Sequence, residues 1–477
     1  MEKKEEKQVY IEFRLFVTTI ILLGVLIILA GASSYFIQAG NFVETALDGK
    51  TTEVYQAIAQ TPVPLWKIVI SPLLSLTGPN GPKIIVLVLF ILIIGGSFAI
   101  LNRSGVLPSI LADLVKRFAN RKQLFLIVNI IIFSLLGSCL GILEEIVPLI
   151  LIFVPLSYRM GWDSITGIAI PFLSAGFGFA AATFNPFTIG TAQKLADVAL
   201  FSGLALRVPF FILTTTTVII YLLRYTSKIE KDPTSSVTYA MDQKMKQLVH
   251  YDDPADQQGV SKGAVIWMGF CFLLIVCVVL SGPVVKIVQD LAFPLIALIF
   301  LIMGLGVGLF AGRKIREVFS FFFHGIADFS PAILLVLMAA AVGYLIVEGN
   351  VMDTILYTVA NLTQGLSKEL AILLIYGFQL FMNFFVPSGT GQAVLTIPIL
   401  APLGDLLGIT RQTVVLAFHF GDGFSNLIWP TNPMLLIAIG LAGVSYKDWF
   451  RWVLPIQVIL ALLGIAFLLL AVNINYV

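Results

Sequence analysis

The feature that most constrains this chain is a pair of polar, glycine-rich interruptions in stretches that are otherwise strongly apolar. The first interruption spans residues 137–141 and is followed by an Asn-Pro dipeptide at 185–186. The second spans residues 387–391 and is followed by another Asn-Pro dipeptide at 432–433. Backbone that leaves a helix inside a bilayer must be satisfied by other protein groups or by a water-filled cavity. Matched interruptions in two halves of a chain therefore predict a binding site for a transported solute.

The spacing of these features indicates an internal duplication. Three residue pairs differ by 250 positions (Ser138 and Ser388, Gly141 and Gly391, Pro148 and Pro398), and three differ by 247 (Gly161 and Gly408, Gly176 and Gly423, Asn185 and Asn432). A shared offset with one three-residue shift predicts that the two halves of the chain repeat the same fold.

Composition predicts a membrane protein. Of the 477 residues, 58% are hydrophobic and 12% are charged, and the mean hydropathy of +0.98 is far above the range of soluble domains. The net charge of +2 gives no reason to expect a nucleic-acid partner. The N-terminal segment lacks a small-residue cleavage site, so we expect residues 13–38 to form a retained first span in the lipid bilayer.

The predicted fold class is an all-α polytopic membrane protein with two inverted repeats. Nine apolar runs are long enough to cross a bilayer, which takes about 20 residues; they fall at 15–38, 84–102, 164–190, 205–224, 264–281, 292–311, 331–347, 412–438 and 453–473. Two interrupted runs, 123–158 and 370–405, are expected to be re-entrant helical hairpins. The segments 164–197 and 412–438 are expected to be broken helices, and 65–76 and 313–328 amphipathic arms.

Lysine and arginine residues predict the orientation. If the N-terminus is cytoplasmic, 21 of the 29 basic residues lie in inside segments, in agreement with the positive-inside rule. The C-terminus then lies outside, and one hairpin opens to each side of the inner (cytoplasmic) membrane. We expect residues 1–224 to form the first repeat and 225–262 a charged cytoplasmic linker. The second repeat is expected at 263–477, where an extra span at 264–281 supplies the inversion.

The predicted substrate site consists of the two hairpin tips and the two helix breaks. Hydroxyls and free amides at such tips can surround a carboxylate, and the helix N-termini after each break add a partial positive field. The tip residues are Ser138 and Gly141 in the first hairpin and Ser388, Gly389, Thr390, Gly391 and Gln392 in the second. The residues at the breaks are Asn185, Thr188, Ser425, Asn426, Thr431 and Asn432. The alternative is that these glycines and prolines only kink transmembrane helices.

Three acidic residues occur within the predicted spans and hairpins, namely Glu144, Glu145 and Asp422. Each costs on the order of 3 kcal/mol at bilayer depth and is therefore a functional candidate, although Glu145 could instead form a structural pair with a basic residue. His419 is either a proton relay or a packing residue. Arg207 is near enough to a span end to snorkel to the interface, so it is not counted as a ligand. Three acids without a certain base favour a solute that carries both an amino or guanidinium group and a carboxylate.

Several long segments resemble the YfcC-like branch of the C4-dicarboxylate anaerobic carrier family, within the ion transporter superfamily. They read GILEEIVPLILIFVPLS, AAATFNPFTIGTAQ, NFFVPSGTGQAVLTIPILAPLGDLLGITRQT and FHFGDGFSNLIWPT. The resemblance covers nearly the whole chain and implies re-entrant hairpins, an elevator-like movement and a homodimer. Superfamily relatives carry Ser-Asn-Thr at both tips, whereas this chain reads GSCLG at 137–141 and PSGTG at 387–391, so the resemblance does not extend to a sodium site.

These observations predict a secondary active transporter for an amino acid, with exchange of the arginine/ornithine type. The alternative is a carrier of C4-dicarboxylates or other organic acids coupled to protons or sodium; no cofactor or resident metal is predicted. A channel would need a ring of like residues around one pore. An intramembrane aspartyl protease would carry Gly-x-Gly-Asp, where residues 419–422 read HFGD, and no enzymatic activity is expected.

Overall fold

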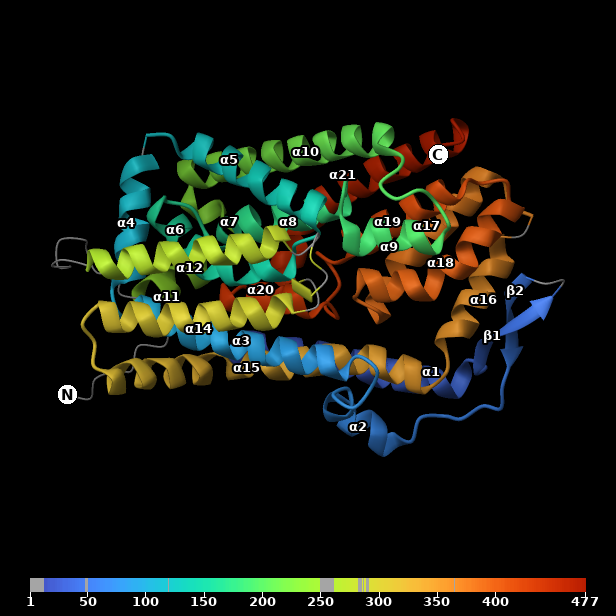
Figure 1. The fold of residues 1–477 in the computed structure, drawn as a ribbon, viewed down its shortest axis with the longest axis horizontal. Helices are drawn as coiled ribbons and strands as arrows, with labels where there is room; N and C mark the ends of the chain where they lie inside the picture. Colours follow the sequence, from blue (N-terminus) through green and yellow to red (C-terminus); the bar gives the residue numbers. More distant parts are fainter. Residues whose placement is uncertain are drawn as a thin grey trace.

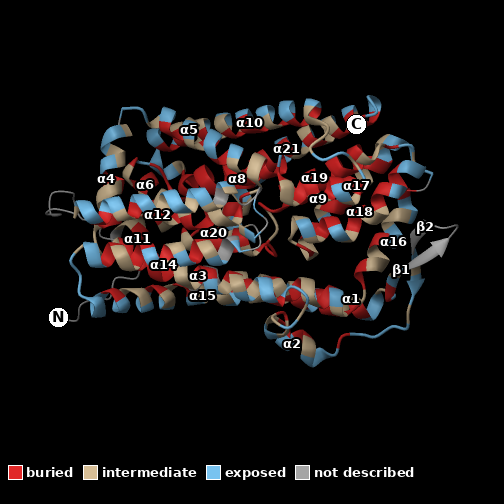
Figure 2. Cartoon of the chain, in the orientation of Figure 1, coloured by how far each residue is buried: buried red, intermediate tan, exposed pale blue. Residues whose placement is uncertain are grey.

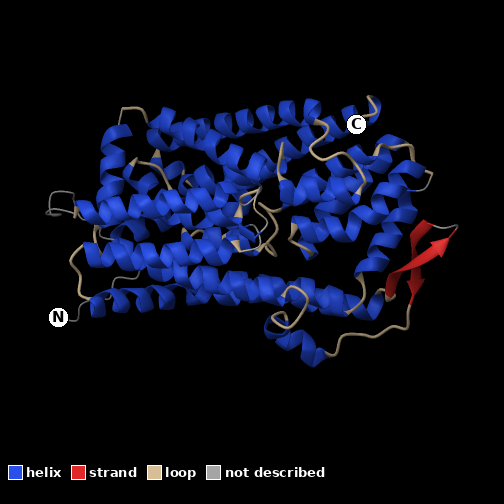
Figure 3. Ribbon diagram, viewed as in Figure 1, coloured by secondary structure: helices blue, strands red, loops and turns tan. Residues whose placement is uncertain are grey.

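The computed structural model describes residues 13–47, 50–118, 120–248, 261–281, 285, 287–288, 291–363 and 365–477. Within this part of the chain, almost all regular structure is helical, and one two-stranded sheet projects from an end of the molecule (Figure 3). Seven of the described helices are long and apolar enough to cross a membrane, judged by length and composition. The helices separate into two bundles that lie side by side along the long axis (Figure 1).

The first bundle is organised around the longest helix, and we call it the α15 bundle. Its members are α1 (Phe13–Phe36), α2 (Leu65–Leu74), α3 (Gly81–Arg103), α12 (Lys262–Ser281), α14 (Ala292–Phe310) and α15 (Ile315–Glu348). Helix α3 packs against α14 and α15, whereas α1 and α2 pack against α15 and α12 packs against α14. The predicted arm at 313–328 is not a separate element. It continues through Pro331 into the following span, because a transmembrane helix tolerates a proline when neighbouring groups satisfy the freed carbonyl.

The second bundle contains both hairpins and both broken helices, and we call it the α19 bundle. Hairpin 1 consists of α5 (Lys122–Leu135), η1 (Leu136–Leu140), η2 (Glu144–Leu149) and α6 (Ile150–Arg159), and hairpin 2 of α17 (Lys368–Phe385) and α18 (Gly389–Leu406). The first broken helix consists of α7 (Ser164–Ile168), η3 (Ala169–Leu173), α8 (Ser174–Ala180), η4 (Pro186–Gly190) and α9 (Thr191–Leu195). The second consists of α19 (Arg411–Ser425) and α20 (Pro433–Leu441), and α10 (Leu204–Lys231) and α21 (Tyr446–Asn473) complete the bundle.

The two hairpins occupy opposite ends of the α19 bundle. In Figure 1, α5 and α6 lie in the left half of the molecule, and α17 and α18 lie in the right half, toward the two-stranded sheet. The buried residues concentrate between them, in α8 and α19 (Figure 2). Every residue of α19 after Arg411 is buried, which is the pattern of a helix enclosed by protein on all sides rather than one that faces lipid.

Two amphipathic helices connect the bundles, and neither is predicted by the sequence analysis. Helix α4 (Val106–Phe118) leads from α3 to hairpin 1, where Arg159 donates to the carbonyl oxygen of Pro108 at 2.7 Å. Helix α16 (Met352–Thr363) leads from α15 to hairpin 2. Helices of 13 and 12 residues are too short to span a bilayer, and span-length hydropathy therefore gives no signal for them.

The sheet corrects the all-α expectation. Strands β1 (Gly40–Leu47) and β2 (Lys50–Ala57) pair antiparallel. The hairpin is held to α16, because Asp353 accepts a hydrogen bond from the backbone N–H of Phe42 at 3.0 Å and the rings of Tyr55 and Tyr357 stack with centroids 4.1 Å apart. The sequence signal is the Asp-Gly pair between two alternating segments, a strong hairpin signal that a search for apolar spans passes over.

The predicted linker at 225–262 begins later than expected, because α10 continues to Lys231. After it, η5 (Pro233–Ser235) and α11 (Tyr239–Leu248) dock onto the α19 bundle; residues 249–260 lie outside the described part of the chain. Asp242 accepts hydrogen bonds from the Tyr158 hydroxyl at 2.9 Å and from Thr238 at 2.7 Å. Burial raises the pKa of Asp242 to about 6. The first part of the linker is therefore a packed element of the α19 bundle.

Candidate functional site

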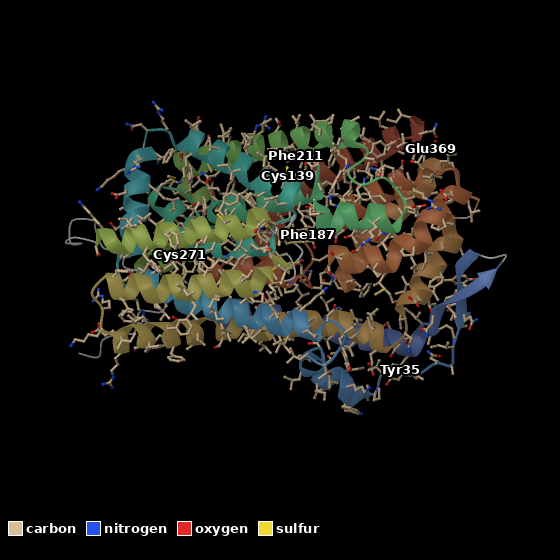
Figure 4. The ribbon with its side chains drawn as sticks, in the orientation of Figure 1. Tyr35, Cys139, Phe187, Phe211, Cys271 and Glu369 are labelled. Carbon is tan, nitrogen blue, oxygen red and sulfur yellow. The ribbon has the colours of Figure 1, made fainter. Side chains whose placement is uncertain are left out.

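The candidate site lies where the two broken helices cross. A Cβ added to Gly423 of α19 would lie 2.4 Å from the Cα of Ala180, and one added to Gly176 of α8 would lie 2.5 Å from the side chain of Leu427. Because these two glycines have no side chains, the two broken helices can pack closely at this point, which places both breaks near each other. In Figure 4, Cys139 of tip 1 and Phe187 of the first broken helix both lie near the middle of the long axis.

Tip 1, residues 137–141, is fastened to the first break. The Ser138 hydroxyl donates to the carbonyl oxygen of Ala181 at 2.9 Å and accepts the N–H of Thr183 at 3.0 Å, so its bonding capacity is used within the protein. Gly141 has a φ of +70°, and a Cβ there would lie 2.3 Å from Oδ1 of Asn185. Only glycine combines this conformation with this close approach. Ser138 therefore supports the site, and Gly141 lies directly against it.

Break 1, residues 181–185, offers two polar atoms without protein partners. Oδ1 of Asn185 caps the next helical segment by accepting the N–H groups of Phe187 and Thr188 at 2.9 and 3.3 Å. Nδ2 of Asn185 and the hydroxyl of Thr188 are buried and have no hydrogen-bond partner within the described residues. Because unpaired buried polar groups are rare and costly, these two atoms are candidate contacts to a solute.

Tip 2, residues 387–391, makes no hydrogen bond to the break of its own half among the described residues. Ser388 caps α18 by accepting the N–H of Gly391 at 3.3 Å. The Thr390 hydroxyl reaches across to the first broken helix and donates to the carbonyl oxygen of Phe187 at 2.9 Å. Gly389 lies against both broken helices, because a Cβ there would be 2.4 Å from Thr188 and 2.8 Å from Oδ2 of Asp422. Tip 2 thus lies directly against Thr188 and the Asp422 carboxylate.

Asp422 is the most exceptional group of the site. Its side chain is 0% exposed, and neither carboxylate oxygen has a hydrogen-bond partner among the described residues. Neither the ion pair of Lys67 with Glu348 nor that of Arg411 with Asp405 includes it. A buried carboxylate without a partner is strongly unfavourable. It therefore needs a proton or a cation.

Break 2, residues 426–432, is closed by a network of asparagines. Nδ2 of Asn383, from α17, donates to the carbonyl oxygen of Asp422 at 3.0 Å, to Ser425 at 2.8 Å and to Asn426 at 2.9 Å. Asn432 donates to Oδ1 of Asn426 at 3.0 Å and caps α20 through Met434 at 2.9 Å. Ser425, Asn426 and Asn432 therefore hold the second break together, and the buried hydroxyl of Thr431 is left without a partner among the described residues.

Three predicted ligands lie apart from the Asp422 carboxylate. Gln392 points between the arms of hairpin 2, where its Nε2 donates to Oε1 of Gln379 at 2.6 Å. Glu144 and Glu145 are half-buried at the start of η2, which packs against α20. Of the three predicted acids, Asp422 alone is fully enclosed at the crossing of the broken helices.

His419 and Arg207 meet at break 1. Nε2 of His419 accepts the N–H of Ala182 at 3.3 Å, so the ring is neutral and carries its proton on Nδ1. Arg207 is 2% exposed rather than directed to the interface. Its guanidinium donates to the carbonyl oxygens of Thr183 at 2.7 Å, Ala182 at 3.3 Å and Ser202. The site therefore has a buried base, which corrects the charge balance predicted from the sequence.

Asn383 and Gln379 are residues that the sequence analysis missed, and Arg207 is one that it set aside. Arg207 was available as an ionisable residue within an apolar span, which is a functional candidate by default. Asn383 and Gln379 interrupt the apolar run YGFQLFMNFF in the first arm of hairpin 2. Such residues are recognisable as buried polar groups, but their partners, 13 to 43 positions away, are not.

Comparison with known proteins agrees with a membrane transporter. The family model described as C4-dicarboxylate anaerobic carrier, DcuC, matches residues 16–473. The chain is 33% identical over 380 residues to the Escherichia coli strain K12 protein named "Putative basic amino acid antiporter YfcC", covering 76% of this chain and 73% of that protein. It is 28% identical over 389 residues to an uncharacterized Haemophilus influenzae protein, covering 80% of this chain and 75% of the relative.

Among solved structures, the chain is similar to the Alcanivorax borkumensis YdaH transporter, with 19% identity and a TM-score of 0.42 over 96% of this chain and 98% of that one. This similarity is too low to bear on the site. The match of the family model extends over nearly the whole chain, and the relative from Escherichia coli exceeds 30% identity. The chain therefore belongs to the C4-dicarboxylate anaerobic carrier family, a family of multi-pass membrane transporters.

Proposed function

We propose that this protein is a secondary transporter that exchanges amino acids of the arginine/ornithine type across the inner membrane. The observation that carries the proposal is Asp422, a fully enclosed carboxylate whose two oxygens have no partner within the described residues. Removing one partner of a buried ion pair leaves an uncompensated charge and costs about 3–5 kcal/mol. A solute ammonium or guanidinium group placed against Asp422 would remove this cost.

The other end of the solute is proposed to meet break 1. Nδ2 of Asn185 and the hydroxyl of Thr188 are unpartnered within the described residues, and an amide N–H and a hydroxyl are suitable donors to a carboxylate. Thr188 also lies against Gly389, which in turn lies against Asp422. Donors on one side and a carboxylate on the other suit a solute with a carboxylate and a cationic group.

The two-bundle architecture supports alternating access by an elevator-like movement of the α19 bundle relative to the α15 bundle. The short helices α4 and α16 are two of the covalent connections through which such a movement would occur, and the third is the chain segment between α11 and α12. The hairpins at opposite ends of the α19 bundle suit inverted repeats, with the N-terminus cytoplasmic and the C-terminus outside (Figure 1). We propose a homodimer, and transport without a cofactor, resident metal or enzymatic step.

A carrier of C4-dicarboxylates coupled to protons or sodium is the second candidate function. It is favoured by the buried guanidinium of Arg207, which would attract an anion, and by the description of the family model. In this case Asp422 would hold a coupled proton or sodium ion rather than part of the solute. The two candidates differ in what must neutralise Asp422, and this difference can be measured.

Thermal stabilisation of the purified protein tests the proposal, because a ligand that binds the folded state raises the unfolding midpoint. Arginine, ornithine, neutral amino acids and C4-dicarboxylates are each added with and without sodium at two pH values. We expect stabilisation by arginine and ornithine without sodium. Stabilisation by dicarboxylates alone would establish the second candidate, and stabilisation by none of these solutes would contradict both.

Asp422→Asn provides the matched test of the carboxylate. We expect this variant to fold and to lose both the stabilisation by arginine and the exchange of labelled arginine in liposomes. The control is Asp405→Asn, which removes an exposed carboxylate paired with Arg411 at the end of α18. Retained exchange in Asp422→Asn would overturn the assignment of the cation site.

A further inference from the structure

The guanidinium of Arg207 lies at the carboxyl end of the first half of a broken helix. The helical run through α7, η3 and α8 ends at Ala180, and the following carbonyl groups have no continuing helix to satisfy them. Arg207 donates to the carbonyl oxygens of Ala182 and Thr183, and Ser138 donates to that of Ala181. Three successive carbonyl groups at the break are therefore occupied by donors.

The peptide groups of Ala182 are held on both sides. Its carbonyl oxygen accepts from Arg207 at 3.3 Å, and its N–H donates to Nε2 of His419 at 3.3 Å. His419 lies three positions before Asp422 on α19, so the two side chains share one face of that helix. Arg207 thus contacts Ala182, Ala182 contacts His419, and His419 lies one helical turn before Asp422. Neither of the ion pairs Lys67–Glu348 and Arg411–Asp405 involves Arg207 or Asp422.

The charge of Arg207 matters because of where the carbonyl groups point. A helix of this length has a partial negative charge of about half an elementary charge at its carboxyl end, which repels anions and attracts cations. Left unpaired, the carbonyl groups of Ala182 and Thr183 would add to the negative potential at this helix end, two to three positions before Asn185. A guanidinium bound to them cancels it and adds a positive field that a carboxylate can use.

We propose that Arg207 is the positioning residue that makes break 1 receptive to the solute carboxylate, so that the protein discriminates an amino acid from the corresponding amine. This inference rests on the proposed function. Arg207 acts through the Ala182 and Thr183 carbonyl groups and its charge, and Asn185 makes the direct contact. The Nε–H of Arg207 is buried and has no hydrogen-bond partner among the described residues. The guanidinium can therefore donate to a further acceptor at this position.

The test compares ligands that differ only in the carboxylate. Dissociation constants are measured for arginine and for agmatine, its decarboxylated form, with wild type, Arg207→Gln and Arg207→Lys in the same detergent. We expect wild type to bind arginine about tenfold more tightly than agmatine, in line with the strength of charge interactions at helix ends. Arg207→Gln is expected to bring the ratio close to one, and Arg207→Lys, which keeps the charge, to retain most of it.

Arg224→Gln is the matched control, because Arg224 is an exposed arginine of the same helix. Its ratio of the dissociation constants for agmatine and arginine should equal that of wild type. A purely structural role for Arg207 predicts that Arg207→Gln weakens arginine and agmatine binding by the same factor, and that result would overturn the inference. If Arg207→Gln does not fold, the test uses Arg207→Lys, which keeps the positive charge. Equal dissociation constants for arginine and agmatine in this folded variant would overturn the inference.

Failure of the proposed function gives a different pattern. If wild type binds neither arginine nor agmatine but binds succinate, the proposed amino acid exchange is wrong, and the same variants are tested with succinate and its monoamide. Arg207 then remains the carboxylate-positioning residue if Arg207→Gln weakens succinate at least tenfold more than the monoamide. Equal weakening of the two ligands would overturn the inference in this case as well.

Discussion

The two halves of the site use the same motifs in opposite ways. In the first half the hairpin tip is hydrogen-bonded, through Ser138, to Ala181 and Thr183, while Nδ2 of Asn185 in the break has no partner within the part of the chain that the structure describes. In the second half the break is fastened, through Asn432 and its neighbours, while tip 2 makes no such bond to its own break among the described residues. Each half thus has one fixed and one available element.

This difference indicates which polar groups are available to bind a solute. A hydroxyl or amide whose hydrogen bonds are complete within the protein has little to offer a ligand, and breaking those bonds destabilises the fold. An unpartnered buried atom has already been removed from water and gains by binding. The sequence motifs alone make the two halves equivalent, whereas the hydrogen bonds divide them into supporting and binding parts.

Among the tips and breaks, the largest expected effect comes from adding a side chain at Gly389 of tip 2. In Gly389→Ala the new methyl group would meet Thr188 and Asp422, and overpacking of this kind costs about 1–3 kcal/mol, or roughly tenfold to a hundredfold in affinity. The matched control is Gly391→Ala, whose Cβ would lie 3.2 Å from Oγ of Ser388 and away from both broken helices. Ligand titration measures the affinity of both variants, and wild-type affinity in Gly389→Ala would remove tip 2 from the site.

The two tip serines should differ in stability rather than in binding. Ser138→Ala removes the donor to Ala181 and an acceptor for Thr183, both buried, and is expected to lower the free energy of unfolding by about 2 kcal/mol. Ser388→Ala removes one helix cap and should cost about 1 kcal/mol. The two variants are compared by their midpoints of thermal unfolding in the same detergent. A larger loss of stability in Ser388→Ala than in Ser138→Ala would contradict the assignment of tip 1 as the tip that is hydrogen-bonded to its own break.

The two break asparagines should show the inverse pattern. Asn185→Ala removes the helix cap at Phe187 and Thr188 and a donor that has no partner among the described residues; the loss of this donor is expected to weaken arginine binding about tenfold, the value of one hydrogen bond to a charged group. Asn432→Ala loses bonds to Asn426 and should mainly lower stability, with affinity changed less than threefold. Binding and unfolding are measured on the same preparations. Unchanged affinity in Asn185→Ala would exclude break 1 as a ligand contact.

The smallest effect is expected at the contact between tip 2 and the first broken helix. Thr390→Val preserves the shape of the side chain and removes only its hydrogen bond to Phe187, which lies in an exposed position and is worth less than about 1 kcal/mol. We expect affinity for arginine to fall by threefold at most. A loss as large as that in Gly389→Ala would show that this bond, rather than the space at Gly389, closes the site.

Sequence patterns predicted the elements of the site better than its bonding. The interruptions at 137–141 and 387–391 mark the hairpin tips, because glycine, serine and proline stop an apolar helix wherever the helix lies. The two-stranded sheet and the connecting helices α4 and α16 were not predicted, since a search for apolar runs of span length passes over short or alternating segments.

By itself, the sequence determined that the chain crosses a membrane repeatedly and that its two halves carry matched breaks, because hydropathy and residue spacing are local properties. Only the tertiary structure decided that Arg207 turns inward to break 1, that Gln392 pairs with Gln379, and that Asp422 is left without a partner among the described residues. These outcomes depend on which distant side chains meet after the broken helices cross. The physical reason is that a polar group becomes a ligand only when folding has buried it and left its hydrogen bonds incomplete.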